Sequence, residues 1–263
     1  MNKKGKICTM CGTKYPADFE GNECRICEDN RQYVPKSGQE WKNDKELLAE
    51  HSVKILQIKK NLYEFEINPK FAIGQRALLI LSENGNVLWD CIPLLDEAAK
   101  SFIEQKGGLK AIVISHPHYY SNMAEWAEEF NCPIYLHEKD KKWVVSGSSK
   151  IKYWSGEKKE LWDGMRVLKI GGHFPASSIL MAPHLSASSA LFCGDTFSLS
   201  PSMAHFSVMY SYPNKMPVSI AEVSRIKEIM EKVEFDEVYG FRSLQNLTND
   251  AKQILLTSLE RYK

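Results

Sequence analysis

The sequence predicts a layered α/β protein with a small metal-binding knuckle near its N-terminus. From Val53 onward, short apolar runs with strand character alternate with amphipathic stretches at helical spacing, as in layered α/β domains. Before them, two Cys-X-X-Cys pairs lie in a segment too short to bury a core of its own. We therefore predict a four-cysteine knuckle with its linker in residues 1–45 and an α/β domain in residues 46–263.

The composition is that of an ordinary globular chain. Its 263 residues are 43% hydrophobic and 25% charged, and the formal net charge is +1 at pH 7. A charge so close to zero gives no reason to expect nucleic acid or an anionic membrane as a partner. No apolar run approaches a membrane span, and no apolar segment follows the basic residues 1–6 as in a secretory signal. We expect a cytoplasmic protein with a small-molecule substrate, and homodimerisation is left open.

The knuckle contains Cys8 and Cys11, and then Cys24 and Cys27. In such tight turns, backbone amides point at the sulfurs and lower the pKa of the thiols, so four thiolates can hold one cation. A structural metal that supplies the folding free energy of the segment is favoured over a redox role. The order Cys-X-X-Cys-Gly with a nearby Tyr15 resembles the rubredoxin-like modules of rubrerythrins, which implies zinc or iron.

The second cysteine pair departs from those modules. Arg25 and Glu28 stand where the modules commonly have Pro and Gly, which weakens the case for electron transfer. The other three cysteines, Cys91, Cys132 and Cys193, lie in apolar runs and are predicted to be core thiols.

Hydrophobic periodicity predicts the elements of the larger domain. The expected strands cover residues 53–58, 62–67, 76–82, 86–91, 109–115, 132–136, 165–170, 177–181, 190–193 and 234–241. The expected helices cover residues 94–106, 122–130, 139–145, 218–233 and 248–261. Asn84-Gly85 between two apolar runs predicts a hairpin, and residues 29–45, which have turn residues and little periodicity, are predicted to be a linker.

Three histidines and a carboxylate follow predicted strands. His116 and His118 come after the apolar run 111–114, and ligands bind at that end of the strands in open α/β sheets. His-X-His is a short pattern that also occurs by chance. It gains weight because His173 follows a glycine pair and Asp195 follows another apolar strand. Together they fit a zinc site that keeps one position for water.

Over residues 50 to 263, the sequence resembles the metallo-β-lactamase superfamily. The histidines of its first motif, its later histidine and its bridging aspartate match His116, His118, His173 and Asp195. The resemblance implies the four-layer αβ/βα sandwich of that superfamily, with the metal at the shared edge of two sheets. The superfamily includes hydrolases of thioesters, lactones, phosphodiesters and β-lactams, as well as iron-using oxidoreductases.

The residues specific to a second metal are altered. Tyr120 stands where the family has an aspartate, Ser121 where it has a histidine, and residues 238–242 carry Gly240 and Phe241 instead of the last histidine. Tyrosine and serine are poor substitutes for these ligands at neutral pH, so we predict one metal rather than two. The carboxylate that would orient or deprotonate an attacking water is also lost.

The favoured function is metal-dependent hydrolysis of an ester, thioester, lactone or related small molecule, with one Zn²⁺ at the His/Asp site. Asp195 would be the fourth ligand or a hydrogen-bond acceptor. Proton handling is assigned to Asp195, Tyr120, His137 or Tyr119 without a choice among them. Iron suits the same ligands, so an iron-dependent oxidoreductase that draws electrons through the four-cysteine site is one alternative. A catalytically degraded binding protein is the other.

Two further features allow two interpretations each. Asp90 resembles the acidic residue that closes an early strand in the superfamily and braces the metal loop, but it also suits a strand-end cap. Residues 198–213 follow Asp195 with several aromatic and methionine side chains and no clear period. They would either wall the pocket or pack on the sheet as an apolar crossover.

Overall fold

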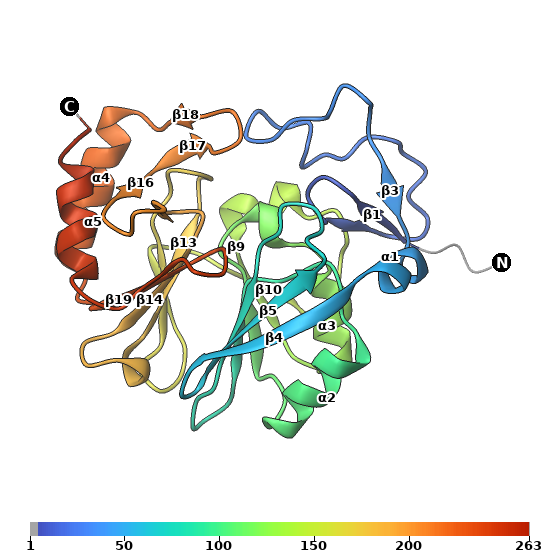
Figure 1. The fold of residues 1–263 in the computed structure, drawn as a ribbon, viewed down its shortest axis with the longest axis horizontal. Coiled ribbons are helices and arrows are strands. Elements are labelled where there is room, and N and C mark those ends of the chain that lie inside the picture. The colour runs from blue at the N-terminus through green and yellow to red at the C-terminus, as the bar shows by residue number, and fades with distance from the viewer. Residues whose placement is uncertain (1–4, 263) are drawn as a thin grey trace.

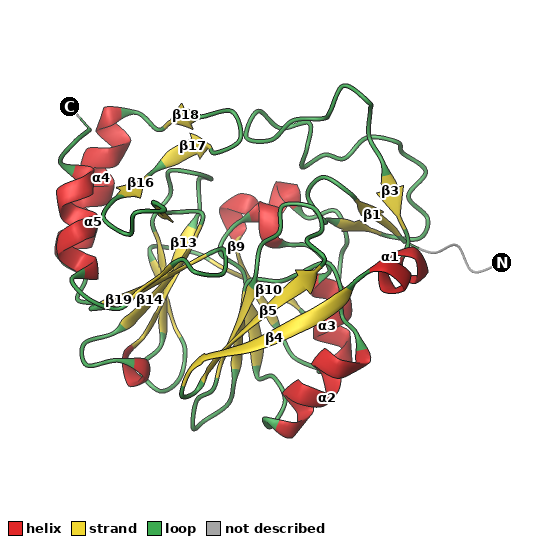
Figure 2. Cartoon of the chain, in the orientation of Figure 1, coloured by secondary structure: helices red, strands yellow, loops and turns green. Residues whose placement is uncertain are grey.

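Two β-sheets pack face to face, and helices cover the outer face of each (Figure 1, Figure 2). This computed structural model describes residues 5–262, so the basic residues 3 and 4 of the N-terminus lie outside the described part. The first sheet has the strand order β10-β9-β8-β7-β6-β5-β4, and the second has the order β11-β12-β13-β14-β19-β20. The predicted four-layer αβ/βα sandwich is confirmed.

The first half of the chain forms the knuckle and the first sheet with its helices. Its strands are β1 (Lys6–Cys8), β2 (Lys14–Tyr15), β3 (Trp41–Lys42), β4 (Ser52–Lys59), β5 (Leu62–Asn68), β6 (Ala77–Ile80), β7 (Val87–Trp89), β8 (Ala111–Val113), β9 (Ile134–His137) and β10 (Ile151–Trp154). Its helices are α1 (Asp44–Glu50), α2 (Glu97–Gln105), α3 (Met123–Glu129) and two 3₁₀ turns, η1 (Pro117–Tyr119) and η2 (Glu138–Trp143).

The second half forms the other sheet and a set of small loop strands above it. The sheet strands are β11 (Lys158–Glu160), β12 (Arg166–Lys169), β13 (Ser178–Ala182), β14 (Ala190–Gly194), β19 (Glu237–Gly240) and β20 (Asn246–Leu247). The loop strands are β15 (Ser198–Leu199), β16 (Phe206–Ser207), β17 (Met209–Ser211) and β18 (Met216–Pro217). The helices are η3 (Pro183–Leu185), α4 (Ile220–Glu231) and α5 (Ala251–Leu259).

Alternation along the strands divides the apolar side chains among three core layers. In β8, Ile112 faces the layer beneath α2 and α3, whereas Val113 faces the layer between the sheets. In β14, Phe192 faces that same middle layer, whereas Leu191 faces α4 and α5. Each such buried side chain stabilises the fold by about 1.5–3 kcal/mol. The long apolar runs of the sequence are therefore strands that are covered on both faces.

Several short elements differ from the predicted set, among them α1, η2 and β10. Helix α1 begins inside the predicted linker, where Asn43 and Glu46 form a reciprocal capping box. Residues 139–145 were predicted to be helical, and the structure has the 3₁₀ turn η2 there. The strand β10, which pairs in parallel with β9, has no clear alternation in the sequence. Within residues 5–262, no helix has the length and apolar character needed to cross a membrane.

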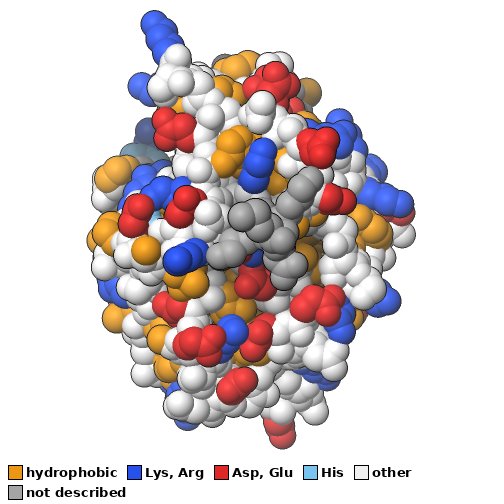
Figure 3. Space-filling view, turned by 90° about the vertical axis from the view of Figure 1, so that its right-hand side faces the viewer, with side chains coloured by type: hydrophobic (Ala, Val, Ile, Leu, Met, Phe, Trp, Pro, Cys, Tyr) orange, Lys and Arg blue, Asp and Glu red, His pale blue; other side chains and the backbone are white. Residues whose placement is uncertain are grey.

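The knuckle packs against the larger domain. Its four cysteines belong to the same buried cluster as Leu47 and Leu94. Gly12 lies at φ +78°, and a Cβ there would be 2.3 Å from a side-chain carbon of Pro93. On this side of the molecule, acidic and basic side chains are interspersed (Figure 3). In the knuckle, Lys14 pairs with Asp44 at 2.6 Å. Whether residues 1–45 and 46–263 fold as separate domains stays a prediction.

Candidate metal centre

The loop after β8 carries the first two histidines of the site. Asp90 follows β7, and its carboxylate accepts a hydrogen bond from the backbone N–H of Ser115 at 2.7 Å. The Ser115 hydroxyl lies 2.8 Å from Nδ1 of His116, which leaves Nε2 of that ring to face the site. His118 lies in η1. Asp90 therefore braces the loop that carries the histidines, in agreement with the first of its two interpretations.

A glycine turn after β12 places the third histidine. Gly171 and Gly172 have φ angles of +85° and +82°, which glycine adopts without strain. His173 follows them, and its Nδ1 lies 3.1 Å from the carbonyl oxygen of Met209. A ring that donates from Nδ1 keeps the lone pair of Nε2 for a ligand.

The three histidines and Asp195 converge on one point. Oδ2 of Asp195 lies 3.3 Å from Nε2 of His116, 3.9 Å from Nδ1 of His118 and 3.7 Å from Nε2 of His173. Nε2 of His173 lies 3.1 Å from Nδ1 of His118. Ligand atoms around a tetrahedral zinc lie about 3.3 Å apart, given zinc–nitrogen bonds of about 2.0–2.1 Å. The donor set and its spacing therefore fit one divalent cation.

Asp195 divides its two oxygens between the site and its support. Oδ2 faces the histidines, and Oδ1 accepts a hydrogen bond from the hydroxyl of Tyr119. Burial favours the neutral carboxyl, but interactions with His116 and His118 outweigh it and hold the pKa of Asp195 well below its usual range. The preceding Gly194 is tightly placed, since a Cβ there would lie 2.4 Å from Oγ of Ser115.

Burial also keeps the histidines ready to act as ligands. It lowers the pKa of His118 to about 4, and it is the main cause that lowers the pKa of His173 well below its ordinary value. Both rings are therefore neutral at pH 7. A neutral imidazole is the form that binds a metal.

The residues at the second-metal positions do not join this group. The hydroxyl of Tyr120 points to the carbonyl oxygen of Asp140 at 3.4 Å, and that of Ser121 accepts a hydrogen bond from Gln75 at 2.8 Å. Phe241 stacks on Tyr119, with ring centroids 6.3 Å apart. In the described chain, the His/Asp group therefore consists of the four predicted ligands.

His137 and Tyr120 were candidates for proton handling, and neither lines the cavity of the site. Nε2 of His137 lies 3.0 Å from the carbonyl oxygen of Gly156, and its Nδ1 accepts from the backbone N–H of Lys139. The His137 side chain therefore holds the backbone around β9 and η2 in place through these hydrogen bonds. Of the two predicted tyrosines, Tyr119 is the one whose hydroxyl donates to the carboxylate of Asp195. The sequence named it only as one option among several.

A cavity of about 760 Å³ leads to the metal centre. His118, His173 and Asp195 line it, and residues of the knuckle, the β5–β6 loop and the chain after β19 form other parts of its wall. Part of the stretch 198–213 walls the cavity, and part of it packs on the second sheet. Met203 and Tyr212 line the cavity, whereas Phe206 and Val208 pack in the core beneath α4 and α5.

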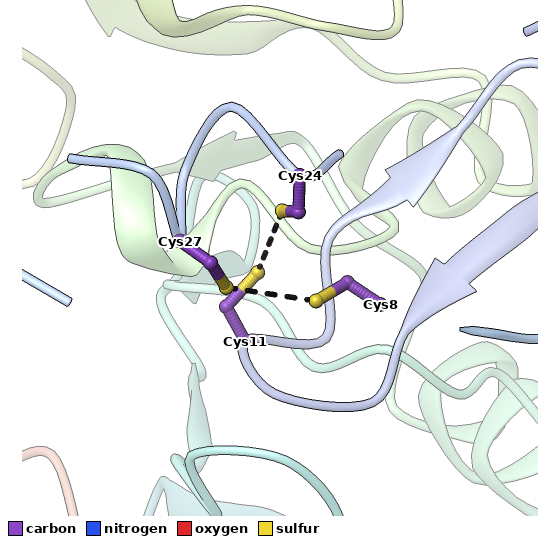
Figure 4. Close-up of side chains that lie close together, drawn as sticks. All are labelled: Cys8, Cys11, Cys24 and Cys27. Atoms are coloured by element: carbon purple, nitrogen blue, oxygen red, sulfur yellow. Dashed lines mark hydrogen bonds between the residues drawn. The ribbon is translucent and has the colours of Figure 1, made fainter. Parts of the chain in front are cut away.

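The four cysteines form a second candidate metal site (Figure 4). Sγ of Cys8 lies 3.6 Å from Sγ of Cys27, and Sγ of Cys11 lies 3.5 Å from Sγ of Cys24. These distances exclude disulfides and are close to the separation of about 3.8 Å expected around a tetrahedral zinc with zinc–sulfur bonds of about 2.3 Å. The hydroxyl of Tyr15 points at the Sγ of Cys24 at 3.5 Å.

Comparison with known proteins shows both the family and the fold. The uncharacterized protein YmaE of Bacillus subtilis is 38% identical over 238 residues, which are 89% of this chain and 87% of that protein. The chain belongs to the same family as YmaE. No family model matches the sequence.

Solved structures with similar folds are metallo-β-lactamase-fold proteins. The DIM-1 metallo-β-lactamase matches 81% of this chain and 99% of its own, with a TM-score of 0.59 and 16% identity. FIM-1 from Pseudomonas aeruginosa, in a mono-zinc form, matches 80% and 95%, with a TM-score of 0.57 and 11% identity. TTHA1623, in a di-iron-bound form, matches 73% and 94%, with a TM-score of 0.51 and 19% identity. At these identities the likeness shows the metallo-β-lactamase fold alone.

Proposed function

We propose that this protein is a metal-dependent hydrolase with a mononuclear zinc centre formed by His116, His118, His173 and Asp195. The observation that carries the proposal is the convergence of four buried ligand atoms, all within 4.8 Å of one another, beside a cavity of about 760 Å³. Such a cavity holds a small molecule. The substrate would be an ester, thioester, lactone or related compound.

A cation at this centre would supply Lewis acidity and lower the pKa of a water molecule toward about 7. The residues of the chain set the conditions for that chemistry. Neutral His118 and His173 present lone pairs, and ionised Asp195 supplies the single negative charge of the donor set. Asp195 is also the one carboxylate among the four ligands, so it is the group of this set that would accept a proton.

Tyr119 acts on this chemistry through Asp195. Burial and the charge of Asp195 raise the pKa of Tyr119 well above its ordinary value, so the phenol keeps its proton and remains a donor. Its hydrogen bond fixes the carboxylate with Oδ2 turned toward the histidines. We therefore assign Tyr119 a positioning role and leave the movement of the proton to Asp195.

A single metal distinguishes this proposal from a dinuclear one. A two-metal site needs ligands for cations about 3.5–4 Å apart. Here Tyr120 and Ser121 make hydrogen bonds elsewhere, and Phe241 lies beside Tyr119. The mono-zinc form of FIM-1 shows that one neighbour of this fold accommodates a single zinc.

Iron is the alternative metal, because TTHA1623 is a neighbour that binds iron and the ligand set accepts either cation. An iron-loaded protein would be an oxidoreductase in which the four-cysteine site transfers electrons. The visible absorption spectrum discriminates between the two functions, since a protein with zinc at both sites is colourless.

Hydrolysis assays test the proposal directly. Zinc-loaded protein would be offered a panel of chromogenic esters, thioesters, lactones, phosphodiesters and β-lactams, beside a His116→Ala/His118→Ala double variant of equal helical content. We expect turnover of at least one class, and its loss in the double variant. Hydrolysis that is equal in both proteins, or absent across the panel in zinc-loaded protein, would refute the assignment.

A further inference from the structure

Arg31 lies where the N-terminal knuckle meets the turn of the third histidine. Its Nε donates a hydrogen bond to the carbonyl oxygen of His173 at 2.5 Å. The guanidinium lies between two aromatic rings, 4.4 Å from the centroid of Phe174 and 4.2 Å from that of Tyr210. Only 12% of this side chain is exposed. A planar cation held between two rings is a rigid contact.

The knuckle side fixes the position of Arg31. Cys27 lies four residues earlier, and a turn at Asp29 connects the two. The Asp29 carboxylate accepts hydrogen bonds from the backbone N–H of Arg31 at 3.0 Å and from its Nη1 at 2.8 Å. The hydroxyl of Ser211 donates to the carbonyl oxygen of Arg31 at 3.0 Å. Both the backbone and the side chain of Arg31 are therefore held.

Arg31 contacts both segments that orient the imidazole of His173. One is the His173–Phe174 turn, which it contacts through the carbonyl oxygen and the Phe174 ring. The other is β17, where Tyr210 stacks on the guanidinium and the adjacent Met209 accepts from Nδ1 of His173. Arg31 thus connects the backbone of His173 to strand β17, whose Met209 carbonyl sets the rotation of the imidazole. Without Arg31 this connection is lost, and the imidazole is held less firmly in the orientation that a metal needs.

We propose that Arg31 is a positioning residue of the His/Asp centre, through which the four-cysteine knuckle holds the ligand His173 in place. The inference rests on metal binding at that centre, as proposed above, but not on hydrolysis. The knuckle would then be a structural part of the metal centre in the larger domain, in addition to any role of its own metal.

Truncation of Arg31 is expected to weaken zinc binding at the His/Asp centre by about tenfold, because supports of ligand residues typically contribute 10–100-fold to metal affinity. The four-cysteine site, whose sulfurs Arg31 does not touch, should keep its metal. Arg31→Lys retains a cationic donor without the planar group, so we expect it to recover part of the affinity.

The experiment measures zinc affinity by chelator competition and records the ligand-field spectrum of the cobalt-substituted full-length protein. Cobalt at the cysteine site is identified by its thiolate charge-transfer bands, which leaves the His/Asp centre to be followed separately. Two matched variants serve as controls. Arg25→Ala removes an exposed arginine of the same knuckle, and Asn214→Ala removes the two hydrogen bonds, each 3.1 Å, to the carbonyl oxygens of Asn30 and Gln32 at the same contact.

We expect Arg31→Ala to lower zinc affinity and change the cobalt spectrum at the His/Asp centre alone, with Arg25→Ala unchanged. If Arg31→Ala weakens zinc binding no more than Asn214→Ala, or weakens both metal sites and the Tm together, the positioning role is refuted. If the wild-type protein takes up no metal that the His116→Ala/His118→Ala substitutions remove, the proposed function fails as well, and the two failures are thereby distinguished.

Discussion

Two adjacent tyrosines, Tyr119 and Tyr120, differ in whether the hydroxyl reaches the metal centre. Tyr119 and Tyr120 are adjacent and both buried, but η1 turns only the Tyr119 hydroxyl toward Asp195. The hydroxyl of Tyr120 faces the carbonyl oxygen of Asp140. The sequence could not choose between the two, because the direction of a side chain in a 3₁₀ turn depends on where the turn begins.

We expect Tyr119→Phe to lower zinc affinity at the His/Asp centre by about tenfold, since the Asp195 carboxylate loses its donor while the ring remains in place. Tyr120→Phe is the matched control, and its affinity should stay at the wild-type value. Chelator competition on both variants checks the difference. An effect of Tyr120→Phe as large as that of Tyr119→Phe would contradict the assignment of roles.

At the scale of elements, the short turn η2 contains a buried carboxylate that the strand and helix patterns of the sequence do not predict. The turn η2 buries Asp140, which is 2% exposed, and leaves its Oδ1 without a hydrogen-bond partner among the described residues. Burial raises the pKa of this carboxyl to about 7, although a hydrogen bond from the backbone of Ala176 and the nearby charges of Arg31 and Lys142 oppose the shift. Asp140 thus destabilises the folded state whenever it is ionised.

This pKa predicts a pH-dependent gain in stability from Asp140→Asn. The folded protein binds the proton more tightly than the unfolded chain, whose pKa is about 3.9. The free energy of unfolding should therefore fall as the pH rises from about 4 to 7, and the neutral amide removes this loss. We expect the variant to be about 1–3 kcal/mol more stable than wild type at pH 8 and equal to it near pH 4. Urea unfolding at both pH values measures the gap, and an equal gap at the two would contradict the shift.

At the scale of the whole molecule, the knuckle and the larger domain share one buried cluster. The four cysteines and Ile26 pack in the same layer as residues beneath α2 and α3. The backbone N–H of Lys14 also donates to the carbonyl oxygen of Ser121, which follows His116, His118 and the turn η1 in the chain. A metal bound by the four cysteines would therefore also stabilise the larger domain, and its loss should lower the stability of that domain.

We expect Cys24→Ser to lower the free energy of unfolding of the larger domain by more than about 3 kcal/mol, because a metal bound by the four cysteines would supply the folding energy of the knuckle. Trp41 is the tryptophan of the knuckle, so in a Trp41→Phe background the fluorescence of the remaining tryptophans, among them the buried Trp89 and Trp126, reports on the larger domain during denaturation. Cys132→Ala is the control, a core thiol outside the knuckle, with an expected cost of about 1 kcal/mol. A tryptophan transition that Cys24→Ser leaves unchanged would show that residues 1–45 form an independent domain.

Periodicity predicted most of the sandwich, since buried strands and amphipathic helices show their burial in the sequence. It missed α1, whose seven residues bury only Leu47. The four ligands were predicted from their places after strands. The contact of Arg31 with His173 could not be predicted, because it joins residues 142 positions apart through a backbone carbonyl. No residue type marks such a contact in a single sequence.

Metal content per chain tests the central claim most directly. Elemental mass spectrometry would be applied to the wild type, to the His116→Ala/His118→Ala variant and to a Cys24→Ser/Cys27→Ser variant. We expect two zinc ions per wild-type chain and one in each double variant. If the histidine substitutions leave the metal content unchanged, the His/Asp group holds no metal, and the hydrolase assignment loses its basis.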